Sequence, residues 1–285
     1  MSTLAIDIGG TKFSMAVFEG ERMVARETRA TDREGGRQWM LAQIAEVAGQ
    51  LARRYPFDIC GIGFGGPVDF SRQRVGRSTH VGGWIDFPLS AWVERELHVP
   101  ALMDNDANVG ALGEALYGAG KGYTPLFYMT LSTGIGGGIV VDGKIYRGAD
   151  SYAGEIGHLT IQPDGPRCLC GSYGCLERLC SGLWLESDYG RPAEQLMQDP
   201  DFVSGYVVNL ALGLKACIML LNPARIVIGG GISKAGEALF GPLRAALRRG
   251  ITEWSRARID IVPAELADDS VLYGALALVK EIPVQ

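Results

Sequence analysis

The chain carries one local pattern twice, and this repeat limits the folds open to it more than any other feature. A short apolar strand over residues 4–8 ends in Gly9-Gly10-Thr11, and residues 13–18 run back beside it. Later, an apolar strand over 126–131 ends in the glycine-rich segment 132–138 and returns through an Asp-Gly turn that is typical of hairpins. Repetition of a whole supersecondary unit predicts an internal duplication.

Each copy continues with a helix and a further strand that ends in glycine. Residues 39–55 have apolar positions at helical spacing, and the strand after them, 59–64, runs into Gly65-Gly66. The helix expected at 207–221 precedes a strand at 225–228 that runs into Gly229-Gly230-Gly231. The sequence therefore predicts an α/β chain built from two similar domains.

The expected boundaries follow from where the second copy begins. We predict an N-terminal domain over 1–108 and a C-terminal domain over 109–269 that carries the cysteine cluster. The last helix, about 270–285, is expected to pack back on the first domain. Ligands of α/β sheets bind beyond the carboxyl ends of the strands, so the glycine loops predict a cleft between the domains.

Charge and hydropathy exclude some partners. The net charge is −5 without a run of Lys or Arg, which disfavours nucleic acid. The longest apolar stretch, around 218–221, is too short for a bilayer, and the N-terminus has no basic leader before an apolar run. We therefore expect a cytoplasmic protein that does not bind a membrane.

The first glycine loop is a candidate phosphate site. In the segment Asp7-x-Gly9-Gly10-Thr11-Lys12, backbone N–H groups can point at a phosphate, and Asp7 can hold Mg²⁺ directly or through water. Thr133-Gly134 begins the second such loop. Neither matches the P-loop or the dinucleotide spacing, and an ordinary hairpin is the alternative for each. Two loops after equivalent strands favour one nucleotide held between them.

Asn105 and Asp106 follow a strand at the start of a helix. Asn105 offers a donor and an acceptor in one side chain, as sugar hydroxyls require. Asp106 suits the base that phosphoryl transfer to a hydroxyl needs. Helix capping is an equally good interpretation of both residues, and Asp104 is expected to be structural.

A histidine and three cysteines predict a zinc site. His158, Cys168, Cys170 and Cys175 fill a tetrahedral shell with no open position, which is typical of structural zinc. The alternative is four unrelated buried residues. If zinc takes one nitrogen of His158, the other can face a ligand between Glu155 and Glu177, although surface acids are the alternative for both.

Three other residues have less context. Trp84 is expected either to wall a sugar site or to pack in the core. His80 and His98 are expected on the surface.

Six segments of the chain occur in a recognisable order: DIGGTK (7–12), GGPVD (65–69), NDAN (105–108), STGIGGG (132–138), GEIGH (154–158) and CLCGSYGCLE (168–177). Together they resemble the ROK family of sugar kinases and repressors, over nearly the whole chain. The resemblance implies a duplicated actin/hexokinase-like fold, related to ribonuclease H, with a central ligand cleft. It also implies ATP as donor, Mg²⁺, and phosphorylation of a hexose at its 6-hydroxyl.

The resemblance carries roles onto individual residues. It implies Asp106 as catalytic base. The sugar ligands that it implies are Asn105, Glu155, His158, Glu177 and Gly66. The implied nucleotide-binding residues are Asp7, Gly9, Gly10, Thr11, Lys12, Thr133, Gly134 and Gly230. It further implies that His158 bridges sugar and zinc and that the chain forms a homodimer.

Glucose is the expected sugar, and N-acetylmannosamine and N-acetylglucosamine are the alternatives. A non-catalytic sugar-sensing regulator is the alternative of another class; the family's repressors carry a DNA-binding arm before the DIGGTK segment, which starts here at residue 7. A kinase of the acetate or glycerol type would not need the Cys3His cluster. The stretch 181–204 is shorter than the family's usual one, so the resemblance does not specify the second-domain surface near the nucleotide or a dimer contact there.

Overall fold

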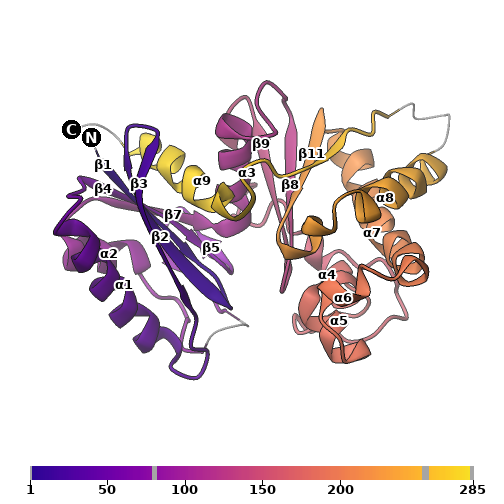
Figure 1. Ribbon diagram of the computed structural model, residues 1–285, viewed down its shortest axis with the longest axis horizontal. Helices are drawn as coiled ribbons and strands as arrows, with labels where there is room; N and C mark the ends of the chain where they lie inside the picture. The colour runs from indigo at the N-terminus through magenta and orange to yellow at the C-terminus, as the bar shows by residue number, and fades with distance from the viewer. Residues whose placement is uncertain (1, 79–81, 252–256, 283–285) are drawn as a thin grey trace.

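Two five-stranded sheets of the same order form the molecule (Figure 1). This computed structural model describes residues 2–78, 82–251 and 257–282. The first sheet has the order β3-β2-β1-β4-β7 and the second the order β10-β9-β8-β11-β12. The first sheet contains β1 (Ser2–Ile8), β2 (Lys12–Glu19), β3 (Arg22–Ala30), β4 (Ile59–Phe64) and β7 (Ala101–Asn105). The second contains β8 (Leu126–Leu131), β9 (Ile135–Val141), β10 (Lys144–Ile145), β11 (Arg225–Gly229) and β12 (Ile261–Pro263).

The strand directions also repeat. β1 is antiparallel to β2 and parallel to β4, and β8 is antiparallel to β9 and parallel to β11. β4 pairs in parallel with β7, as β11 does with β12. The predicted duplication is therefore confirmed strand by strand.

Helices α1 (Gly36–Ala52) and α2 (Leu89–Leu97) cover the first sheet. The helical spacing read in the sequence buries Met40, Ile44 and Val47 against β1 and β4 in one core. Trp84 is 1% exposed and packs edge to face on Phe64, so it belongs to this core.

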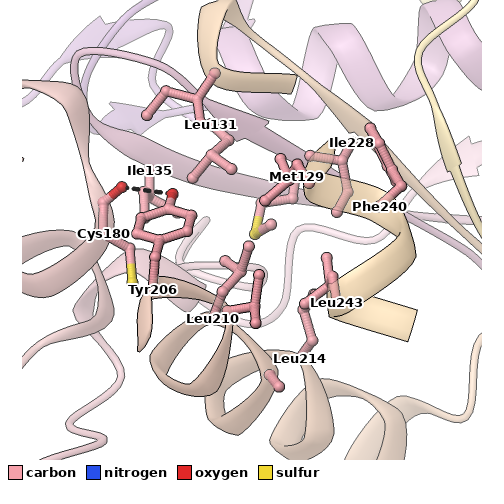
Figure 2. Close-up of a cluster of buried hydrophobic side chains, with 14 of the residues drawn as sticks. Met129, Leu131, Ile135, Cys180, Tyr206, Leu210, Leu214, Ile228, Phe240 and Leu243 are labelled. Carbon is pink, nitrogen blue, oxygen red and sulfur yellow. Dashed lines mark hydrogen bonds between the residues drawn. The ribbon is translucent and has the colours of Figure 1, made fainter. Parts of the chain in front are cut away.

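The second sheet packs on α7 (Pro200–Leu221), α8 (Glu237–Gly250) and α4 (Leu176–Cys180). Figure 2 shows Met129, Leu210 and Leu243 meeting between strands and helices, while the Tyr206 hydroxyl donates to the Cys180 carbonyl at 2.9 Å. α7 begins seven residues before the predicted start, because Asp199 caps it and Pro200 suits its first turn. By length and composition alone α7 could cross a bilayer. However, α7 packs in this core, and core helices often have the length and apolar composition of a membrane-spanning helix.

Two helices lie between the sheets, α3 (Asp106–Tyr117) and α9 (Ser270–Leu278). α3 contacts β8 and β9, whereas α9 contacts β1 and β4, and the helices pack on each other. Their backbones approach so closely that a Cβ on Gly274 would lie 1.7 Å from the Val109 carbonyl oxygen. The division of the chain into two domains at residue 108 stays a prediction.

The remaining elements are short. They are β5 (Val68–Asp69), β6 (Arg74–Val75), α5 (Gly182–Tyr189), α6 (Ala193–Leu196), and the 3-10 turns η1 (Ile156–His158), η2 (Gly231–Ala235), η3 (Ala267–Asp269) and η4 (Val279–Glu281).

Candidate functional site

The carboxyl ends of the strands enclose a cleft of about 510 Å³. Every residue predicted to contact a sugar or a nucleotide lines it: Asp7, Gly9, Gly10, Thr11, Lys12, Gly66, Asn105, Asp106, Thr133, Gly134, Glu155, His158, Glu177 and Gly230. They come from both sheets. The structure therefore brings the predicted set together, while the role of each residue stays a prediction.

Asn105 and Asp106 use their side chains differently. The Asn105 side-chain oxygen accepts from the N–H groups of Ala107 and Asn108 at 2.9 and 3.3 Å, so this residue caps α3. Its amide nitrogen donates to the Gly66 carbonyl at 3.0 Å and has a second hydrogen for a ligand. Asp106 accepts from the Ala107 N–H at 2.9 Å and lines the cleft.

Burial changes the acidity of two carboxyls in the cleft. Burial, with a smaller contribution from the Asp7 carboxylate, raises the pKa of Asp106 to about 7, against the Ala107 N–H that lowers it. Burial also raises the pKa of Asp7 to about 7, although Lys12 and Arg26 oppose this. A carboxyl with a pKa near the working pH is well suited to accept a proton.

The first glycine turn is tied to β3 and the segment after it. The Gly9 N–H donates to the Lys12 carbonyl at 3.0 Å, and the Thr31 hydroxyl donates to the Gly9 carbonyl at 2.9 Å. The Arg33 side chain donates to the Gly10 carbonyl at 2.9 Å. These bonds fix the carbonyls of Gly9 and Gly10 in a turn that lines the cleft.

The second glycine segment is shorter than predicted. Only residues 132–134 form a turn, in which the Ser132 N–H donates to the Gly134 carbonyl at 3.0 Å, and the Gly182 N–H donates to the Ser132 carbonyl at 2.7 Å. Gly136, Gly137 and Gly138 lie within β9 instead. A Cβ on Gly138 would lie 2.4 Å from the Ala107 carbonyl oxygen and one on Gly136 would lie 3.0 Å from the Ala107 Cβ, so these two glycines admit α3 against the sheet.

His158, Cys168, Cys170 and Cys175 place their ligand atoms within 4.8 Å of one another. The Cys170 and Cys175 sulfurs are 3.6 Å apart, and all six cysteines are free thiols. Zinc–sulfur bonds of about 2.3 Å in a tetrahedron would place two sulfurs roughly 3.8 Å apart. The donor set and spacing therefore fit a closed metal site, and zinc as its metal is a proposal.

Glu155 and Glu177 flank this cluster. Glu177 is buried, and its carboxylate accepts from the Ile135 N–H at 2.9 Å, which ties the 132–134 turn to the cysteine segment. This contact could not be predicted from the sequence, where Glu177 shows only the preference of acids for a helix N-terminus. Burial raises the pKa of Glu155, while His158 lowers it. Neither acid is an ordinary surface residue.

Three charged residues that line the cleft escaped the sequence analysis: Arg77, Lys234 and Asp268. Asp268 contacts the Lys234 ammonium at 3.0 Å and the Lys12 ammonium at 3.6 Å. All three line the cleft. Lys234 stands one turn after Gly230, whose φ of +87° and place against the Leu131 carbonyl require glycine.

A second cavity of about 770 Å³ adjoins the cleft and shares Gly231 and Lys234 with it. Apolar side chains of α7, η2 and α8 line it, among them Val203, Val207 and Ile232. The short stretch 181–204 therefore forms part of its wall. His98 is exposed as predicted, and His80 lies outside the described residues.

Comparisons with known proteins agree with this geometry. The model of the ROK family matches residues 3–282. A glucokinase of Thermotoga maritima is 31% identical over 310 residues, covering 99% of this chain and 98% of the relative. A solved ROK family glucokinase from Streptomyces griseus, in complex with glucose and AMPPNP, superposes with a TM-score of 0.87 at 29% identity, over 99% of this chain and all of the other. A putative xylose repressor of a Caldicellulosiruptor species is 32% identical over 252 residues, which cover 78% of this chain and 62% of the repressor.

Proposed function

This chain belongs to the ROK family, and from that premise we propose that it is an ATP-dependent hexose kinase that phosphorylates the 6-hydroxyl of its sugar, with glucose first. The observation that carries this proposal is the shared cleft. A buried carboxyl with a raised pKa, Asp106, lines the same space as two turns that can hold phosphates and four side chains that can hold hydroxyls. The glucokinase relatives support the kinase class and the choice of glucose.

In this proposal the sugar lies between the two sheets. Asn105 gives its free N–H to a hydroxyl from the first sheet, and Glu155, His158 and Glu177 contact hydroxyls from the second. Gly66 offers backbone from the β4 loop. Zinc would be held by His158, Cys168, Cys170 and Cys175, where it would fix the ring of His158 and leave the other nitrogen for the sugar.

The nucleotide lies on the opposite side of the cleft. Its phosphates lie along Gly9, Gly10, Thr11, Thr133 and Gly134, near the ammonium groups of Lys12 and Lys234. Asp7 would hold Mg²⁺, whose charge helps to neutralise the phosphates. The adenosine extends past Gly230 into the adjoining apolar cavity, whose size and shared wall at Gly231 support this placement.

Asp106 then accepts the proton of the 6-hydroxyl as that oxygen attacks the terminal phosphorus in line with the leaving group. The turns hold the donor, and the sugar ligands orient the acceptor. Closure of the two halves of the molecule would exclude water, which otherwise competes as acceptor.

The same proposal includes a homodimer and a cytoplasmic location. The family resemblance supports the first, and the free thiols support a reducing compartment.

A coupled assay of ADP release over glucose, mannose, N-acetylglucosamine and N-acetylmannosamine tests the function. We expect turnover with at least one hexose and the highest kcat/KM with glucose. A higher kcat/KM for N-acetylmannosamine than for glucose would identify an amino sugar as the substrate. Sugar binding without any turnover would contradict the kinase and favour a sugar-sensing regulator.

A further inference from the structure

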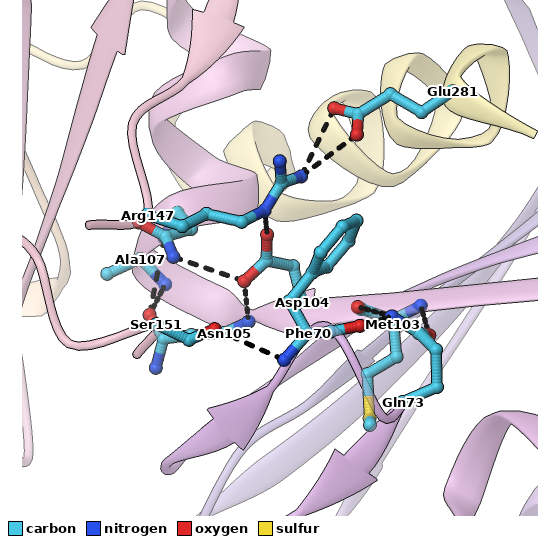
Figure 3. Close-up of polar contacts among 10 residues, drawn as sticks. Phe70, Gln73, Met103, Asp104, Asn105, Ala107, Arg147, Ser151 and Glu281 are labelled. Atoms are coloured by element: carbon cyan, nitrogen blue, oxygen red, sulfur yellow. Dashed lines mark hydrogen bonds and ion pairs between the residues drawn. The ribbon is translucent and has the colours of Figure 1, made fainter. Parts of the chain in front are cut away.

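A loop of the second sheet reaches across to the first at Arg147. This 146–155 loop follows β10. The Arg147 side chain donates from Nε to the carboxylate of Asp104, a residue near the end of β7, at 2.7 Å (Figure 3). The same guanidinium donates to Glu281 at 3.1 Å and lies 3.5 Å from the centre of the Phe70 ring. One cation therefore joins the loop to three parts of the first half of the molecule.

Asp104 passes this contact to the start of α3. Its side chain is fully buried, and the oxygen that does not face Arg147 accepts from the Asn105 N–H at 2.7 Å and from the Asn108 amide at 3.1 Å. Burial raises the pKa of Asp104 and Arg147 lowers it. Because a buried carboxylate left without its cation is costly, the first turn of α3, with Asp106 as its first residue, is held where Arg147 holds Asp104.

The backbone of Arg147 sets the other end of the loop. The Ala153 N–H donates to the Arg147 carbonyl at 3.2 Å, which closes the loop just before Gly154. Gly154 has a φ of +93°, and a Cβ there would lie 2.6 Å from the Gly137 carbonyl. The next residue is Glu155, so the place of this carboxylate follows from the closed loop and its seat on β9.

We propose that Arg147 is a positioning residue that sets the distance between Asp106 and Glu155 across the cleft. It reaches Asp106 through its side chain and Asp104, and Glu155 through its backbone. The inference rests on the proposed function, in which Glu155 binds the sugar and Asp106 accepts its proton. A misplacement of about 1 Å between bound substrate and catalytic group can cost roughly 100-fold in rate, so such a bridge has a large effect on turnover.

The first test substitutes Arg147→Met. We expect kcat to fall about 10- to 100-fold and the sugar KM to rise severalfold, with the ATP KM within about twofold of wild type, because the nucleotide turns do not contact Arg147. The matched control is Arg225→Met. Arg225 pairs with Asp260 at 3.0 Å and lies 3.6 Å from the Tyr123 ring, and its side chain is 20% exposed against 17% for Arg147. Both substitutions should lower Tm, but only Arg147→Met should change kcat and the sugar KM.

Two further variants separate positioning from stability. Arg147→Met with Asp104→Asn removes both charges and should recover much of the lost Tm without recovering kcat. Arg147→Lys keeps a cation near Asp104 but loses the flat guanidinium that also contacts Glu281 and Phe70, so kcat should fall less than in Arg147→Met without reaching the wild-type value. Recovery of both Tm and kcat in the double variant would show a purely structural role and overturn the proposal.

Hydrogen exchange tests the coupling without any turnover. In Arg147→Met, or in the double variant if the single one does not fold, amides of 104–110 and of 150–158 should exchange faster together, whereas Arg225→Met should leave both segments unchanged. Unchanged exchange in either segment would contradict the proposal even if the wild type is an active kinase. Conversely, a wild type without hexose turnover would refute the proposed function, while the exchange result would still decide whether Arg147 couples the two segments.

Discussion

Asp7 and Asp106 come from different elements, the end of β1 and the start of α3, and they meet in one cleft where the Asp7 carboxylate raises the pKa of Asp106. Each has a pKa of about 7 in the ligand-free protein. Because the two buried carboxylates repel each other, the pair tends to share a proton near neutral pH. A cation placed at Asp7 would favour the charged form of that residue and shift the balance of the pair.

Asp106→Asn should remove most of the turnover and leave sugar binding intact. A positioned base contributes roughly 10²- to 10⁴-fold to rate, and asparagine keeps the shape while losing the basicity. The measurement is kcat by coupled assay beside the glucose Kd by calorimetry. We expect kcat to fall within that range and Kd to change less than about threefold. A kcat near that of wild type would exclude Asp106 as the base.

Asp7→Asn should stabilise the ligand-free protein in a manner that depends on pH. The pKa of Asp7 is raised from 3.8 to about 7 by folding, so the folded state binds more protons than the unfolded state between these values. Asp7 therefore contributes its full stabilisation of the folded wild type below pH 4, and this contribution is lost as the pH rises through 7. Thermal melts at pH 4, 6 and 8 should show a Tm gain for the variant that grows with pH. Substitution of the exposed Asp164→Asn should give no such trend.

Removal of zinc should weaken the binding of sugar more than the binding of nucleotide. His158 lines the cleft and belongs to the Cys3His cluster, whereas the turns proposed for the phosphates do not. We expect one zinc per chain by elemental analysis and its loss in Cys175→Ser. Glucose affinity of that variant should fall about tenfold or more, in keeping with the effect of disturbing groups around a metal site, and ATP affinity should change little. Metal-free protein with full glucose affinity would refute this role.

Lys234→Met should raise the ATP KM and spare the sugar KM. Lys234 lines both the cleft and the adjoining cavity. Its ion-pair partner, Asp268, also pairs with Lys12. Hydrogen bonds to charged groups are worth about 1.5 to 3 kcal/mol, so loss of one phosphate contact should raise the ATP KM roughly tenfold or more. Steady-state kinetics with each substrate varied make the comparison. The exposed Lys144→Met is the control, and an unchanged ATP KM in Lys234→Met would exclude the contact.

Much of the fold could be predicted because it is written in local patterns. The strands 59–64 and 126–131 have the predicted bounds, since alternation, spacing and flanking glycines or prolines mark them. The start of α7 was missed because seven residues of helix precede its most apolar part, and the cap at Asp199 decides where it begins. Gly136 to Gly138 look like a loop in sequence, yet they pair with β8 as part of β9, and Gly136 and Gly138 are glycines because α3 approaches them closely.

The site followed from sequence where residues of one motif act together, as in the cluster of His158 with the three cysteines. It did not follow where the partners are distant in the chain. Glu177 meets Ile135, Arg147 meets Asp104, and Lys234 meets Asp268 only after the two sheets and the crossing at 265–270 are in place. Spacing along the chain carries no record of such pairs.

The most direct test of the central claim is the product itself. Purified protein incubated with glucose, ATP and Mg²⁺ would be followed by ³¹P and ¹H NMR. We predict a phosphate monoester on the 6-oxygen of glucose, formed with ADP in equal amounts and nearly absent with Asp106→Asn. Release of inorganic phosphate without any sugar ester, for glucose and for every other hexose offered, would contradict the account.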